Sequence, residues 1–136
     1  MIKAILFDLD DTLLNSKEAE YKAICRFKSS FNVFNEISND EFAKTWNQIT
    51  AGAYDEYEKG KFTFKQQRIE RIKRIFKKYN VEISDEEADK NFKMYLELYQ
   101  ENWELLKNAK EVLEKLSKKF TLGIVTNGDS KHQRKW

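Results

Sequence analysis

The chain has no proline, one cysteine and only four glycines among its 136 residues. The single cysteine, Cys25, excludes a disulfide within the chain. No apolar run approaches the roughly 20 residues of a membrane-spanning helix. The first residues also lack the basic leader and long apolar stretch of a signal peptide. These absences predict a helix-rich, cytoplasmic protein with few rigid turns and no membrane partner.

An excess of charge of one sign is also missing. The chain has 25 basic and 23 acidic residues, a net charge of +2, so electrostatics gives no reason to expect a nucleic-acid partner. Hydrophobic residues make up 40% and aromatic residues 14% of the chain, which favours a globular fold over disorder. The length suits one modest domain, or one domain with a small insert.

Two apolar runs predict strands, and the long region between them predicts helices. Residues 2–7 form a nearly continuous apolar run, typical of a strand buried on both faces of a parallel sheet. Residues 120–126 form a second run. Between them, helix starts are predicted by residue pairs with capping-box spacing, and Gly60 is placed to end a helix. The pairs are Ser38 with Glu41, Thr63 with Gln66, Ser84 with Glu87, and Asn108 with Glu111.

This order predicts an α/β fold with a parallel sheet and a helical insert. Residues 1–16 and 107–136 are expected to form part of the α/β core, and residues 17–106 a four-helix bundle. Only two strands are visible, and a doubly wound sheet needs more. We therefore expect a truncated form of a longer protein, or strands supplied from elsewhere. The exposed sheet edge should then pair, through a homodimer or a rearranged C-terminal segment.

The residues after the first strand carry the chemistry. Asp8 and Asp10 lie two residues apart at the strand's carboxyl end, where ligands bind in open α/β sheets. One carboxylate could attack phosphorus and form an acyl-phosphate. The second could protonate the leaving oxygen and later accept a proton from water. A divalent cation would offset the repulsion between these acids and a phosphate, and oxygen ligands suit Mg²⁺.

The segment from Phe7 to Thr12 resembles the first motif of the haloacid dehalogenase (HAD) superfamily, an apolar strand followed by Asp-x-Asp-x-Thr. This resemblance implies that Asp8 is the nucleophile and a metal ligand. It implies that Asp10 is the general acid/base, and that its backbone carbonyl also binds the metal. Thr12 would help to hold the geometry of the loop.

Thr126, Asn127 and Gly128 resemble the family's second motif, in which the threonine hydroxyl and nearby backbone amides bind the transferring phosphoryl group. The helical insert resembles the small cap that one large branch of the family carries between these motifs. The fold expected from the resemblance is a Rossmann-like HAD core with a helical cap. The third-motif lysine and the fourth-motif acids cannot be placed in the chain.

Several alternatives are open at this point. Asp8 and Asp10 could be ordinary loop acids, whereas a calcium loop is disfavoured because Leu13 stands where glycine is needed. Asn127 and Gly128 alone would suit a hairpin turn. Asp11 is expected to be a solvated or loop-bonding acid without a catalytic role.

The leading hypothesis is a Mg²⁺-dependent hydrolase of phosphate monoesters of small metabolites, acting through an aspartyl-phosphate on Asp8. The resemblance implies that an aspartate at position 10 favours phosphate esters over the carbon–halogen bonds of a dehalogenase-type hydrolase. The alternative of another class is a catalytically incomplete fragment, a helical module that binds a partner or itself.

Overall fold

The computed structural model describes residues 1–126. The sequence predictions for Asn127, Gly128 and a helix beginning near Asp129 lie outside these residues. The chain divides into two compact units, one formed by Met1–Ala19 with Trp103–Trp136 and the other by Glu20–Asn102. We call them the α/β unit and the helical unit and describe each by itself. Within residues 1–126, every helix is too short or too polar to cross a membrane.

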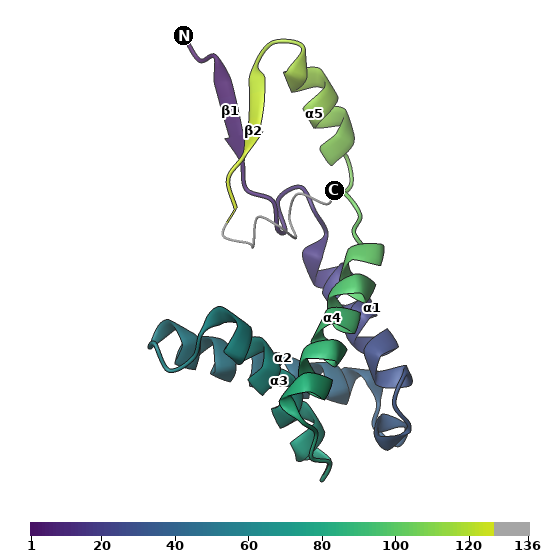
Figure 1. The fold of residues 1–136 in the computed structure, drawn as a ribbon. Coiled ribbons are helices and arrows are strands. Elements are labelled where there is room, and N and C mark those ends of the chain that lie inside the picture. Colours follow the sequence, from purple (N-terminus) through teal and green to yellow (C-terminus); the bar gives the residue numbers. More distant parts are fainter. Residues whose placement is uncertain (127–136) are drawn as a thin grey trace. The chain divides into compact units, whose positions relative to one another are not determined.

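The α/β unit contains two parallel strands, β1 (Ala4–Phe7) and β2 (Thr121–Ile124). Their register pairs Ala4 with Thr121 and Phe7 with Ile124. Helix α5 (Ala109–Ser117) precedes β2 and packs against it, as Figure 1 shows. The predicted parallel pairing is therefore confirmed, although both strands are shorter than the apolar runs that predicted them.

The strands are not buried on both faces, so this part of the prediction is wrong. Leu6 is 66% exposed, Ile124 57% and Val125 59%. The physical reason is that the two strands are the whole sheet in the described part of the chain. The core of this unit is small and consists of Leu9, Leu13, Leu14 and Ala109, with partly buried neighbours around them. Part of the apolar surface of the sheet thus faces solvent.

The helical unit has its own core, built from four helices and a short 3-10 helix. Helix α1 (Ser16–Ser29) begins in the α/β unit and continues into this one. The other elements are the 3-10 helix Asn32–Phe34, α2 (Asn39–Glu58), α3 (Phe64–Lys78) and α4 (Asp85–Glu101). Helix α3 packs against both α2 and α4. Aromatic rings fill the centre: Phe27 lies 5.0 Å from Trp46 and 6.4 Å from Phe76, between ring centroids. The predicted helices are confirmed.

The helix ends follow the predicted capping residues, with one exception. Ser38 accepts a hydrogen bond from the Glu41 N–H, and Thr63 and Ser84 form reciprocal capping boxes. Gly60 has a φ of 80° directly after α2, the left-handed conformation that glycine adopts without strain. Asn108 is the exception. It precedes α5 with a φ of 67° and makes no side-chain cap bond, because this backbone conformation differs from that of an ordinary N-cap.

Candidate functional site

The loop after β1 is a single tight turn fixed by its own backbone. The Leu9 carbonyl accepts hydrogen bonds from the N–H groups of Thr12, Leu13 and Leu14, at 3.3, 3.0 and 3.0 Å. Leu9, Leu13 and Leu14 are at most 6% exposed. The loop therefore buries its leucines beneath the turn while Asp11 and Thr12 remain exposed.

Asp8 is exposed and lies directly beyond the last residue of β1. The Thr12 hydroxyl donates a hydrogen bond to its Oδ2 atom at 3.4 Å, so the turn brings these two predicted site residues together. Asp10 is half-buried, and its backbone pairs with that of Leu14. This pairing closes the turn and holds Asp10 at the same end of the sheet as Asp8.

The carboxyl end of β2 lies beside this loop. The Val125 N–H donates to the Phe7 carbonyl at 2.8 Å, so the parallel pairing continues past Ile124. Asp8 follows Phe7 and Thr126 follows Val125, so they leave neighbouring strands at the same edge of the sheet. Asn127 and Gly128 lie outside the described residues. Of the predicted phosphate-binding residues, the structure thus describes Thr126 alone.

Asp11 is exposed, and its carboxylate holds the start of helix α1 through hydrogen bonds. Its Oδ1 atom accepts a hydrogen bond from the Ser16 hydroxyl at 2.7 Å and from the Lys17 N–H at 3.3 Å. Its φ of 58° is left-handed, a conformation that aspartate tolerates better than most residues. A carboxylate at a helix N-terminus is also favoured by the helix dipole. The sequence-based expectation that Asp11 bonds within the loop is confirmed.

A second segment clamps the acidic loop, and sequence reasoning did not identify it. The Asn15 N–H donates to the Glu104 carbonyl at 2.9 Å, and the Leu106 N–H donates to the Leu13 carbonyl at 2.7 Å. Leu14 pairs with Leu105 between these bonds. Because the bonds are made by backbone atoms, the side chains of residues 104–106 give no signal for them, apart from the leucines that pack on the same small core.

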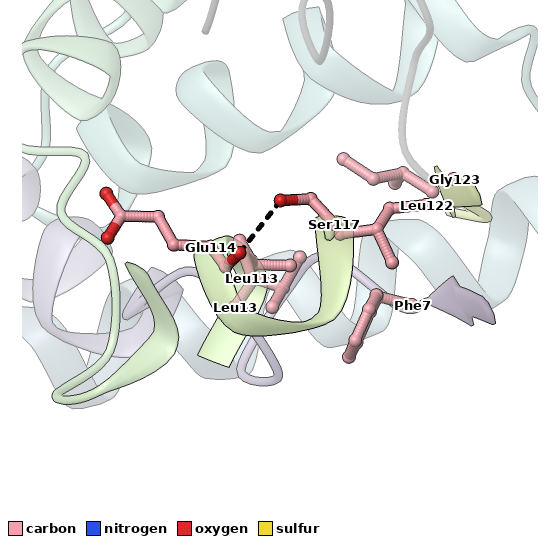
Figure 2. A pocket seen from close by; sticks show the side chains of 8 residues that line it. Phe7, Leu13, Leu113, Glu114, Ser117, Leu122 and Gly123 are labelled. Atoms are coloured by element: carbon pink, nitrogen blue, oxygen red, sulfur yellow. Dashed lines mark hydrogen bonds between the residues drawn. The ribbon is translucent and has the colours of Figure 1, made fainter. Parts of the chain in front are cut away.

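An apolar pocket of about 390 Å³ lies elsewhere in the α/β unit, between α5, the strands and the loop. Phe7, Leu13, Leu113 and Leu122 line it, and Figure 2 shows their side chains together with the Ser117 hydroxyl, which donates to the Glu114 carbonyl at 2.9 Å. The lining does not include Asp8, Asp10 or Thr126. We therefore interpret the pocket as apolar core surface that lacks a packing partner, not as the site of chemistry.

The donor set of the acidic loop fits a hard divalent cation. Asp8 and Asp10 offer only oxygen ligands, which Mg²⁺ prefers, and protein-bound Mg²⁺ commonly keeps several waters. Within residues 1–126, no three or more His, Cys, Asp or Glu side chains are grouped closely enough to hold a metal ion. The loop can thus contribute part of a magnesium site, with the remaining ligands coming from other sources.

Comparison with known proteins identifies the family to which the chain belongs. A model of the haloacid dehalogenase-like hydrolases matches residues 2–136. YfnB of Bacillus subtilis, named as a candidate HAD-hydrolase, is 30% identical over 133 residues, which cover 98% of this chain and 54% of YfnB. A crystal structure of YfnB bound to magnesium matches with a TM-score of 0.80 and 29% identity, over 98% of this chain and 56% of that one.

Two further solved structures share the fold. A predicted phosphoglycolate phosphatase from Haemophilus somnus 129PT matches with a TM-score of 0.55 and 25% identity, over 96% of this chain and 54% of that one. A 2-haloacid dehalogenase from Pseudomonas syringae pv. tomato DC3000 matches with a TM-score of 0.58 and 24% identity, over 97% of this chain and 59% of that one. The chain thus spans little more than half the length of these relatives.

Proposed function

Because the chain belongs to the haloacid dehalogenase-like hydrolases, we propose that the protein hydrolyses phosphate monoesters of small metabolites, with Asp8 as nucleophile. One observation carries the proposal: the parallel register places Asp8 and Asp10 at the edge of the sheet where Thr126 also emerges. The similarity to the Haemophilus somnus structure, described as a predicted phosphoglycolate phosphatase, supports phosphate chemistry.

In the proposed reaction, a carboxylate oxygen of Asp8 attacks phosphorus while the bond from phosphorus to the ester oxygen breaks. Asp10 donates a proton to the departing alcohol. In the second step Asp10 accepts a proton from a water molecule that attacks the aspartyl-phosphate, which releases inorganic phosphate and restores Asp8. Thr12, which donates to Asp8, orients the nucleophile. The Thr126 hydroxyl, with Asn127 and Gly128, would hold the phosphoryl group.

A bound Mg²⁺ would lower the repulsion between the phosphate and the two aspartates. Asp8 and the backbone carbonyl of Asp10 are the groups that we propose to hold it. We further propose that residues 1–16 and 107–136 form part of the catalytic core and that residues 17–106 form a cap that selects the substrate. The groups expected of the family's third and fourth motifs would lie beyond this chain, which is about half as long as its relatives. We also propose the cytoplasmic location that the sequence predicts.

A second function is favoured by the exposed sheet. Leu6, Ile124 and Val125 are each more than half exposed, and each strand has a neighbour on one side only in the described residues. An apolar edge of this kind pairs readily with another strand. The chain alone would then be a catalytically incomplete module that forms a homodimer through this edge. Sedimentation equilibrium over a range of concentrations tests this function, and a strictly monomeric chain would count against it.

The catalytic proposal is tested with this chain and a C-terminally extended form, each assayed with p-nitrophenyl phosphate with and without Mg²⁺. We expect turnover that requires Mg²⁺ and falls by at least about a thousandfold in Asp8→Asn, the scale seen when covalent nucleophiles are removed. Turnover by the extended form alone would assign the missing groups to the C-terminal half.

The matched control for this experiment is Asp11→Asn, which changes a neighbouring acid of the same loop but keeps an oxygen acceptor for Ser16 and Lys17. We expect this variant to retain most of its activity. Turnover that survives in Asp8→Asn, or that appears only with a 2-haloacid, would exclude the phosphatase mechanism.

A further inference from the structure

Helices α2 and α3 form a hairpin whose tip, residues 54–68, carries a row of aromatic rings outside the core of the helical unit. Tyr57 lies between Tyr54 and Phe64, with its ring centroid 5.5 and 5.8 Å from theirs. None of the three belongs to the core cluster of this unit, and Tyr54 is 44% and Phe64 37% exposed. Figure 1 shows the turn of the hairpin projecting away from α1 and α4. The row thus connects the two helices at the surface, where a partner can reach it.

The charges of the hairpin tip are reversed with respect to the helix dipoles. A helix is stabilised by acidic residues in its first turn and by basic residues in its last turn. The far ends of both helices follow this rule, because α2 begins with Asp40 and Glu41 and α3 ends with Lys77 and Lys78. At the tip, α2 has no basic residue in its last turn and α3 has no acidic residue in its first turn. The tip instead carries Asp55, Glu56 and Glu58 at the end of α2, and Lys65 at the start of α3.

Ion pairs within the chain account for only part of this reversal. Asp55 and Glu56 each pair with a lysine of the turn, at 2.6 and 2.5 Å. Glu58 is exposed. The Lys65 side chain is 71% exposed and lies 3.9 Å from the Asp89 carboxylate, and an exposed pair at this distance contributes little. Glu58 and Lys65 therefore present most of their charge to the surroundings.

The charge pattern of the hairpin tip is complementary to itself. Residues 54–68 contain three acidic and four basic residues, so the tip has no large excess of one sign that would favour a polyanion or a polycation as partner. In a two-fold symmetric interface, each residue of one copy meets its counterpart's neighbour in both directions. Two tips placed antiparallel bring the acidic end of α2 in one copy beside the basic start of α3 in the other. The helix ends that meet also have dipoles of opposite sign.

We propose that the hairpin tip binds the same surface of a second copy of the chain, with the aromatic row at the centre and Glu58 facing Lys65 of the second copy. Aromatic and arginine side chains are enriched at the centres of protein interfaces. Arg68 extends the row, because its guanidinium carbon lies 4.3 Å from the centroid of the Phe64 ring. The surface lies wholly in the helical unit. It is independent of the proposed hydrolysis and of pairing through the sheet edge.

The test measures self-association of the full chain by sedimentation equilibrium, for the unmodified chain and for two charge-reversal variants. Glu58→Lys sets a lysine opposite Lys65, and Lys65→Glu sets a glutamate opposite Glu58, each at two places in a symmetric dimer. We expect either variant to weaken self-association by at least about tenfold, because like charges that face each other destabilise an interface. A one-to-one mixture of the two variants should dimerise again, within about threefold of the unmodified affinity, because every facing pair then joins opposite charges.

The mixture also distinguishes the hairpin tip from the sheet edge. Association through the sheet edge would have the same affinity in both variants and would gain nothing from mixing them, and this result would overturn the proposal. An unmodified chain that stays monomeric up to about 1 mM would overturn it as well. Lys78→Glu is the matched control, because it reverses an exposed lysine at the opposite end of α3. It should change the affinity by less than about twofold.

Tyr54→Ala tests the aromatic row separately from the charges. Tyr54 lies outside the core cluster and is 44% exposed, so we expect the melting temperature to change by less than about 4 °C. Self-association should nevertheless weaken by at least about fivefold, as for a residue near the centre of an interface. An unchanged affinity in Tyr54→Ala would remove the rings from the interface and contradict the proposal.

Discussion

The two units of the molecule differ in how completely each buries its own apolar residues. The helical unit encloses Phe27, Phe34, Phe42, Trp46 and Phe76 to 4% exposure or less. Among its described residues, the α/β unit buries only three leucines and two alanines to 8% exposure or less, while its strands present Leu6 and Ile124 to solvent. A unit that closes its own core is stable by itself, whereas one that does not depends on additional chain. The candidate catalytic acids belong to the dependent unit.

The largest expected contrast is in hydrogen exchange. Amides of α2 and α3 should exchange at least about a hundredfold more slowly than those of β1 and β2, because opening free energies range from near zero up to the global value. Exchange of the intact chain followed by mass spectrometry measures both units at once. Equal protection of strands and helices would remove the distinction between the units.

The next effect concerns the aromatic core. Phe27→Ala should lower the free energy of unfolding of the helical unit by about 3–5 kcal/mol, the usual cost of emptying a buried phenylalanine site. Phe64→Ala serves as the matched control, because Phe64 is 37% exposed and should cost less than about 1 kcal/mol. Urea titration monitored by the circular dichroism of the helices gives both unfolding free energies. Similar losses in the two variants would argue against Phe27 as the centre of the aromatic core.

A smaller effect is expected at the start of α1, the helix that runs from one unit into the other. Asp11→Ala removes the acceptor of the Ser16 and Lys17 hydrogen bonds and places alanine in a left-handed conformation. We expect a loss of about 1–2 kcal/mol in unfolding free energy, similar to that of a helix cap. Asp11→Asn keeps an acceptor and tolerates this backbone, so it should retain most of the stability. Equal losses in the two variants would mean that the charge, not the acceptor, matters.

The smallest effect is a pH dependence in the helical unit. Hydrogen bonds from Arg74 and Lys61 lower the pKa of Glu56 from 4.5 to about 2. A carboxyl group with a lowered folded-state pKa contributes stability that is complete above pH 4.5 and is lost as the pH falls toward 2. The melting temperatures of the unmodified chain and of Glu56→Gln should therefore converge across this range. A constant difference between them would contradict the assignment.

Local patterns in the sequence predicted much of this structure because they report on local physics. Ser38, Thr63 and Ser84 start helices as expected, since a capping side chain needs only the residues next to it in sequence. The acidic turn was also predictable in part, because the sequence shows a strand that is followed by Asp8, Asp10 and Thr12. Helix α5 also starts after Asn108 as predicted, but the capping spacing does not reveal the left-handed backbone and the missing side-chain bond at this residue.

Nonlocal features were not predictable in the same way. The clamp on the acidic loop by Glu104 and Leu106 is made by backbone atoms, which carry no side-chain signal. The burial of the strands was overestimated because an apolar run shows what a strand can bury, not whether a partner is present to cover it. Likewise, the exposure of Tyr54 and Phe64 could not be predicted, because the spacing of aromatic residues along a helix does not show where the core ends.

The register that pairs Ala4 with Thr121 has a consequence for synthesis on the ribosome. The first strand leaves the exit tunnel early, but its neighbour emerges only after nearly all of the described chain has been translated. The helices in between make mostly contacts between neighbouring segments, so they can fold during this interval, as domains commonly do. The acidic loop is thus made before the helices, whereas the strand end that completes its edge of the sheet is made after them.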